Sequence, residues 1–206
     1  MPHATILSPI STIRLPALDR PALEAHFIRL DSEDRRLRFG SGISDDALRD
    51  YVRRIDFGRD GLFAVQDDAL RPLAVVHIAM GSGPAEMGLS VLPEARGQGL
   101  GNALFRRAVT FLRNRGAASV FMHCLSENAA IMHLARKNRM RMVRHGTESD
   151  ARLELAPATA DSFINEWLDD QRGRAVQALR QNGRLAQAYF AALAPPQLTE
   201  PVARAP

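Results

Sequence analysis

Cysteine is almost absent from this sequence. Cys124 is the only one among 206 residues, so no disulfide can form within the chain. Such cysteine usage is typical of a reducing compartment, and we expect a cytoplasmic protein in which Cys124 is a small core residue. The histidines show no metal-ligand spacing with cysteine or acidic residues, and we therefore expect no metal site.

Long apolar runs are missing too. No segment approaches the roughly 18 consecutive apolar residues of a membrane span, and the first residues lack the basic and apolar regions of a secretory signal. We therefore expect no membrane association. A hydrophobic content of 46% and a charged content of 24% are typical of a soluble globular protein, and the length suffices for one sizeable core.

Lysine occurs once, at Lys137, and every other strong base is arginine. This bias is typical of a GC-rich bacterial genome. The arginines are interleaved with acids, as in residues 31–38, whereas nucleic-acid-binding proteins gather them on one face beside aromatic side chains. We therefore expect no nucleic-acid partner, and the net charge of +4 suits an anionic small molecule.

Apolar spacing predicts alternating helices and strands over most of the chain. Helices are expected from Arg20, from a Ser44 cap to Arg54, over residues 102–115, and from Asn128. Strands are expected over residues 11–17, 62–66, 73–80, 85–92, 119–125, 141–144 and 151–155. An antiparallel meander followed by a strand–helix–strand crossover predicts an α/β (α+β) fold, with a mixed, mostly antiparallel sheet flanked by helices.

The C-terminal part has a purely helical pattern. We therefore divide the chain into a main domain, residues 1–156, and a helical extension, residues 157–206, with a frayed tail from Ala194. Gly173 and Gly183 predict a break within the extension. Its apolar positions must pack either on the main domain or on a second copy of the chain, so a homodimer is one possible arrangement.

A glycine-rich loop joins the strand over residues 85–92 to the helix over residues 102–115. Glycines let the backbone adopt positive φ and approach a ligand closely. The free amides and the dipole at the start of the following helix favour an anion such as a pyrophosphate. The loop is not a P-loop, because no Gly-Lys-Ser/Thr follows. The alternative is a turn whose glycines serve packing only.

The residues of this loop carry a resemblance to a known family. They read Arg96-Gly97-Gln98-Gly99-Leu100-Gly101 after a Val-Leu-Pro-Glu lead-in. This resembles the acyl-CoA signature Arg/Gln-x-x-Gly-x-Gly/Ala of the GNAT N-acetyltransferase superfamily. The similarity extends to Ser126-Glu127-Asn128 and covers roughly residues 12–155.

The resemblance implies that residues 1–156 are an acyl-CoA-binding GNAT domain whose cosubstrate is acetyl-CoA. In such a domain the amides of Arg96 through Asn102 hold the pyrophosphate. The backbone from Leu89 to Val91 pairs with the pantetheine, and Asn128 contacts the cofactor's arm. The acyl group enters a gap between the strand ending at Val91 and the strand ending at Leu125, and Gly88 could mark the bulge where that gap begins.

Glu86 is the candidate catalytic base. Strand alternation places Glu86, Gly88 and Ser90 on one face, with Met87 on the other. An amine must lose its proton before it attacks a thioester, and a carboxylate in apolar surroundings has a raised pKa that suits this task. The spacing from Glu86 to the glycine loop, and the wording of residues 30–39, resemble bacterial protein-lysine acetyltransferases. The alternative is a strand-edge carboxylate that only caps a loop.

The sequence lacks the residue that acts as general acid in many members of this family. Many GNAT enzymes place a tyrosine seven residues after the asparagine, and here that position is Ala135. Protonation of the thiolate then falls to water, to Ser126 or to another group. We expect an N-acetyltransferase that acts by direct attack of a primary amine, either a protein lysine or a small amine. The alternative is a regulatory domain that binds acyl-CoA without chemistry.

Two further features of the sequence each have two interpretations. His77 lies in a strand and is either a hydrogen-bonded core histidine or a residue of the acceptor cleft. The arginines at positions 35, 36 and 38 are either a solvated helix end or a site for an acidic acceptor or the cofactor's 3′-phosphate.

Overall fold

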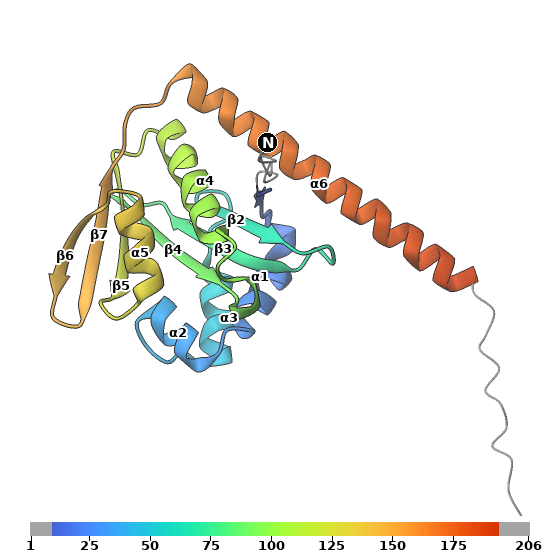
Figure 1. Cartoon of the computed structure of the whole chain (residues 1–206), viewed down its shortest axis with the longest axis horizontal. Coiled ribbons are helices and arrows are strands. Elements are labelled where there is room, and N and C mark those ends of the chain that lie inside the picture. The colour runs from blue at the N-terminus through green and yellow to red at the C-terminus, as the bar shows by residue number, and fades with distance from the viewer. Residues whose placement is uncertain (1–9, 194–206) are drawn as a thin grey trace, which may run out of the picture.

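A seven-stranded sheet organises the chain, of which this computed structural model describes residues 10–193 (Figure 1). The spatial order of the strands is β1-β2-β3-β4-β5-β7-β6, and only the β4–β5 pair is parallel. The strands are β1 (Ile13–Arg14), β2 (Gly61–Gln66), β3 (Pro72–Ala79), β4 (Ala85–Val91), β5 (Ser119–Leu125), β6 (Arg141–His145) and β7 (Glu148–Glu154). The predicted mixed, mostly antiparallel sheet is confirmed.

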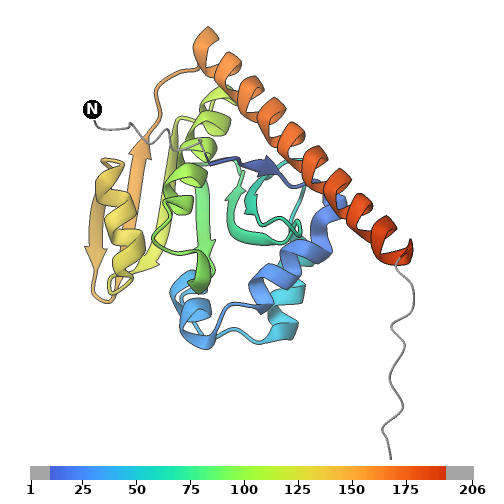
Figure 2. The same cartoon turned by 45° about the vertical axis from the view of Figure 1, so that its right-hand side comes forward.

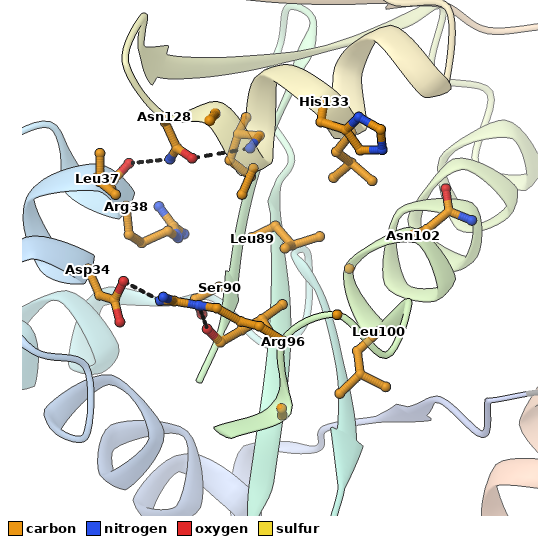
Figure 3. A pocket seen from close by; sticks show the side chains of 18 of the residues that line it. Asp34, Leu37, Arg38, Leu89, Ser90, Arg96, Leu100, Asn102, Asn128 and His133 are labelled. Carbon is orange, nitrogen blue, oxygen red and sulfur yellow. Dashed lines mark hydrogen bonds and ion pairs between the residues drawn. The ribbon is translucent and has the colours of Figure 1, made fainter. Parts of the chain in front are cut away.

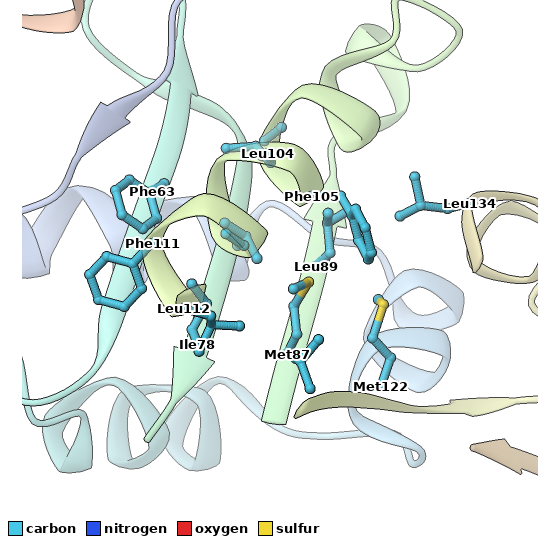
Figure 4. Packing of buried hydrophobic residues seen from close by; sticks show 14 of the residues in the cluster. Phe63, Ile78, Met87, Leu89, Leu104, Phe105, Phe111, Leu112, Met122 and Leu134 are labelled. Atoms are coloured by element: carbon cyan, nitrogen blue, oxygen red, sulfur yellow. The ribbon is translucent and has the colours of Figure 1, made fainter. Parts of the chain in front are cut away.

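Six α-helices accompany the sheet in the described part of the chain. They are α1 (Arg20–Ile28), α2 (Ser32–Phe39), α3 (Asp45–Arg54), α4 (Leu100–Asn114), α5 (Ala129–Lys137) and α6 (Ala160–Leu193). Each of two apolar clusters fills the space between one face of the sheet and its helices. One contains Phe63, Phe111 and Leu104 beneath α4 (Figure 4), and the other contains Leu23 and Leu48 beneath α1 and α3.

Strand β4 separates from β5 soon after the two strands meet. Their parallel pairing covers only Ala85 with Val120 and Glu86 with Phe121. On its other side β4 stays paired with β3 from Glu86 to Val91 without a register shift. The predicted gap between these strands is therefore present, but the bulge expected at Gly88 is wrong.

Helix α2 is an element that the sequence analysis did not identify. Its N-cap is Asp31, whose side chain accepts a hydrogen bond from the Asp34 amide at 2.8 Å. Gly40 ends the helix with φ of +79°, a conformation that glycine adopts without strain. The helix lies beside β4 and β5, close to the point where they separate (Figure 1).

Helix α6 runs without interruption from Ala160 to Leu193, so the predicted break is wrong. It crosses α4 and β1 and extends past the sheet (Figure 2). Gly173 permits this crossing, because a Cβ there would lie 2.6 Å from the Thr12 carbonyl oxygen. The expected frayed tail lies outside the described residues, and the domain boundary at residue 156 stays a prediction. No helix within residues 10–193 is long and apolar enough to cross a membrane.

Buried polar contacts hold α6 against α4. The guanidinium of Arg107 is 2% exposed, forms an ion pair with Asp170 and lies 4.6 Å from the Phe63 ring centre. Nearby, the Asn114 side-chain amide donates to a Glu166 carboxylate oxygen at 2.6 Å. A buried charge needs such a partner, so these contacts fix where the extension lies.

The two glycines of α6 give a matched pair of stability tests. Gly173→Ala should lower the free energy of unfolding by roughly 1–3 kcal/mol, because the new methyl group would collide with the backbone of β1. Gly183→Ala meets nothing within 4 Å and should raise it by roughly 0.5–1 kcal/mol through helix propensity. Urea unfolding of both variants measures these changes. Equal effects would show that α6 does not cross β1 closely.

A buried histidine links α1 to the sheet. His26 is 1% exposed, its Nδ1 donates to the Pro72 carbonyl at 3.0 Å, and its Nε2 accepts from the Ser90 hydroxyl at 2.8 Å. Both contacts suit a neutral ring. Burial lowers the pKa of His26 to about 4 from its ordinary 6.5.

This histidine should make stability depend on pH. Below pH 6.5 the unfolded chain gains a proton at His26 that the folded chain takes up only near pH 4. The free energy of unfolding should therefore fall as the pH drops through that window, by about 3 kcal/mol in total at about 1.4 kcal/mol per unit. Urea titrations of the wild type and His26→Gln should diverge in pH dependence. Parallel profiles would contradict a buried neutral His26.

Candidate functional site

A cavity of about 650 Å³ opens where β4 leaves β5 (Figure 3). Its walls come from β4, from the glycine loop with the start of α4, from α5, and from the ends of α1 and α2. Segments distant in sequence therefore meet at one place, as the predicted gap requires. The residues of β4 that line it are Leu89, Ser90 and Val91.

The glycine loop forms one end of the cavity. Gly97 and Gly99 have φ of +73° and +81°, and Gly99 is the N-cap of α4 without a side chain to satisfy the first amides. The first intrahelical donor is the Ala103 amide, which reaches the Gly99 carbonyl at 3.1 Å. The amides of Leu100, Gly101 and Asn102 thus precede any helical partner and face the cavity end, where the helix dipole favours an anion.

Two residues of this loop make contacts within the chain. The amide of Arg96 donates to the Pro93 carbonyl at 3.3 Å, so it is already used within a turn. The Arg96 side chain instead lines the cavity and forms an ion pair with Asp34 from α2. The Gln98 side chain donates to the Glu94 carbonyl at 3.5 Å and does not line the cavity. The amide of Arg96 is thus engaged within the chain, and the role of the loop amides in holding a pyrophosphate stays a prediction.

The edge of β4 beyond Glu86 has no strand partner on its β5 side. An extended group can pair with such an edge as an added strand. Leu89 points to the opposite side from Ser90 and packs in the core beneath α4, which keeps this part of β4 rigid. The segment from Leu89 to Val91 is thus placed as expected for a pantetheine site, a role that stays a prediction.

Helix α5 supplies the opposite wall. Asn128 is its N-cap, accepts from the Ile131 amide at 3.1 Å and donates to the Leu37 carbonyl at 3.3 Å. Its side chain therefore joins α5 to α2 in addition to lining the cavity. His133 and Lys137 also line it, and neither was identified from the sequence. They lie four residues apart, a spacing that places both on one face of the helix and could have paired them from the sequence.

Glu86 lies at the last residue of the β4–β5 pairing, where the gap closes. It shares a face of β4 with Gly88, as alternation predicts, while Met87 is buried in the core on the other face. The Glu86 side chain is exposed and does not line the cavity. The apolar enclosure that we expected around this carboxylate is therefore absent.

His77 belongs to a buried chain of hydrogen bonds. Its Nε2 donates to Asp60 at 3.1 Å, and its Nδ1 accepts from the Tyr51 hydroxyl at 2.6 Å. Burial lowers the pKa of His77, with Asp60 opposing the shift. The structure thus supports the interpretation of a core histidine. Tyr51 receives a further hydrogen bond at 3.2 Å from Arg38, which does line the cavity.

The other candidate groups do not line the cavity. Cys124 is buried, as expected for a core residue, and burial raises the pKa of its thiol. Ala135 is fully buried in the core. The Ser126 hydroxyl lies 2.8 Å from that of Ser149, outside the cavity wall. Within residues 10–193, His, Cys, Asp and Glu side chains form no group of three or more that could hold a metal ion.

Comparisons with known proteins agree with this geometry. The family model described as acetyltransferase (GNAT) family matches residues 25–139, more than half of the chain. Among curated protein sequences, none matches this chain significantly.

Solved structures show the same fold at low sequence identity. The GNAT domain of S. lividans PAT has a TM-score of 0.61 at 16% identity, over 70% of this chain and 89% of that one. The ribosomal-protein-S18-alanine N-acetyltransferase from Escherichia coli gives 0.55 at 20%, over 73% and 97%. An N-acetyltransferase from Staphylococcus aureus Mu50 gives 0.56 at 13%, over 71% and 99%.

The matched segment spans α2, β4, the glycine loop and all of α5, which together enclose the cavity. The chain belongs to the acetyltransferase (GNAT) family.

Proposed function

We propose that this protein transfers an acetyl group from acetyl-CoA to a primary amine, a protein lysine or a small amine, by direct attack and without a covalent enzyme intermediate. The observation that carries the proposal is the two-residue pairing of β4 with β5. The divergence opens a cavity bordered by the start of α4 and by a free strand edge, and Glu86 lies on the same strand where the gap closes. Family membership supports acyl transfer from a CoA thioester.

The residues present fit acetyl-CoA. Free amides from Gly97 to Asn102 suit the pyrophosphate, with the helix dipole of α4 adding to them. A Cβ on Gly101 would lie 3.5 Å from the Leu89 side chain, so a larger residue there would crowd the strand that borders the cavity. The free edge of β4 from Leu89 to Val91 suits the amides of pantetheine.

Glu86 is the proposed base. The amine of the acceptor is mostly protonated at neutral pH, and the exposed carboxylate at the closed end of the gap can take its proton directly or through water. The free amine then attacks the thioester carbonyl carbon, the carbon–sulfur bond breaks, and the thiolate takes a proton. Because Ala135 is buried and Ser126 lies outside the cavity, we assign that last proton to water.

A domain that binds acyl-CoA without chemistry is the second candidate. It is favoured by the absence of the usual tyrosine, since Ala135 occupies that position, and by the exposure of Glu86. Both functions need the cavity, so binding alone does not separate them.

Replacement of Glu86 by Gln separates them. Glu86→Gln should reduce kcat for amine acetylation by about 100-fold, as expected for loss of a general base, and leave the Kd for acetyl-CoA unchanged. Thiol release measures turnover, and calorimetry measures binding. Glu154→Gln, an exposed carboxylate on β7, is the matched control and should change neither quantity.

The possible outcomes give different conclusions. Full turnover in Glu86→Gln would show that Glu86 is not the base. Tight acetyl-CoA binding by the wild type, with no turnover on a broad panel of amines and lysine peptides, would favour the regulatory domain.

A further inference from the structure

Arg38 lies flat against the backbone of β4 at Gly88. A Cβ added to Gly88 would overlap the Arg38 guanidinium, because the three atoms nearest to that Cβ all belong to this group. Only glycine therefore leaves room for the arginine at this position. Figure 3 shows the side chain reaching from α2 toward β4 in the cavity. This close approach is a second role for Gly88, in place of the bulge that is absent.

The guanidinium is held in this place by two half-buried aromatic residues. It donates to the Tyr51 hydroxyl at 3.2 Å and lies 4.8 Å from the centre of the Phe39 ring. Tyr51 in turn donates to His77, which donates to Asp60. Asp60 also accepts from the Met80 amide at 3.1 Å. All of these hydrogen bonds run in one direction, from the donor Arg38 through Tyr51 and His77 to the acceptor Asp60. They orient Arg38 without neutralising its charge.

The neighbouring arginines differ from Arg38 in their partners. Arg35 forms an ion pair with Asp45 at 2.7 Å, and Arg36 forms one with Glu33 at 2.8 Å. Within residues 10–193, no carboxylate forms an ion pair with Arg38, and its buried Nε has no hydrogen-bond partner. A partly buried cation costs free energy unless an anion pairs with it. Arg38 thus has the properties of a binding group that awaits an anion.

Glu86 lies two residues before Gly88 on the same face of β4, about 7 Å along a strand. If Glu86 takes the proton of the acceptor amine, as proposed above, a carboxylate and a guanidinium both face the approaching acceptor. This pair complements a molecule that carries an ammonium group and a carboxylate a few bonds apart. Arginine binds carboxylates through two parallel hydrogen bonds, which adds orientation to affinity.

We propose that Arg38 binds a substrate carboxylate beside β4, and that this carboxylate belongs to the amine acceptor. The acceptor class is then a small amine with a nearby carboxylate, such as a free amino acid. The inference rests on the proposed amine acetylation and narrows its acceptor. The same chemistry has a second source, the acyl group of a dicarboxylic acyl-CoA, which the experiment distinguishes.

The test compares free amino acids with their carboxamides, in which a neutral amide replaces the carboxylate. With acetyl-CoA, wild-type kcat/KM for the best amino acid should exceed that for its carboxamide at least about tenfold, the effect of one charge-assisted pair. Arg38→Gln should abolish this preference by losing activity on the acid and not on the amide. To test whether the carboxylate belongs instead to the acyl group, binding and turnover of succinyl-CoA are compared with those of butyryl-CoA.

Two further variants control the measurement. Arg53→Gln removes an exposed arginine of α3 that pairs with Asp50, and it should keep the full preference. Tyr51→Phe keeps the charge of Arg38 and removes its tether, so the preference should shrink without vanishing. The tyrosine acts here as a positioning residue. Thermal unfolding verifies that each variant is folded.

Binding provides a readout that does not need turnover. Calorimetry of the CoA-saturated protein should show tighter binding of the amino acid than of its carboxamide, and Arg38→Gln should remove the difference. If binding shows this pattern without turnover, the carboxylate site stands and the proposed acetylation fails. If the carboxamide binds and reacts as well as the acid, and succinyl-CoA shows no dependence on Arg38, the carboxylate site is wrong.

Discussion

The structure depends on the point at which β4 and β5 stop pairing. Two residue pairs hold the parallel strands together, and beyond Glu86 the two strands diverge while β4 keeps its register with β3. A strand edge without a partner leaves backbone donors and acceptors unsatisfied, which makes it a natural place for an extended ligand. The cavity lies where this divergence begins to open, with the start of α4 at its end.

Different elements fix the two sides of β4. On one side, Leu89 and Met87 pack beneath α4, so the strand and that helix form one rigid unit. On the other side, Ser90 is tied to His26, and Gly88 supports Arg38. Apolar packing thus holds one face of β4 and polar contacts hold the other, and in our proposal the second face meets the acceptor.

Sequence periodicity predicted most of the sheet and helices, because local patterns determine those elements. The strand over residues 119–125 and the Ser44 cap were predicted as observed, and the glycine loop was placed correctly. Features that depend on distant contacts were not predictable. Gly173 reads as a helix breaker in sequence, yet it permits contact with β1. Arg36 has a local partner in Glu33, but nothing local distinguishes Arg38 from Arg35, because their partners Tyr51 and Asp45 come from α3.

The most direct test of the central claim is a calorimetric titration of acetyl-CoA into the wild type, Gly99→Leu and Gly116→Leu. Both glycines have positive φ, +81° and +72°, at opposite ends of α4, so the substitutions strain the backbone alike. The account predicts that the wild type and Gly116→Leu bind alike, and that Gly99→Leu loses at least about tenfold in affinity. No binding by the folded wild type, or equal affinities in both variants, would contradict it.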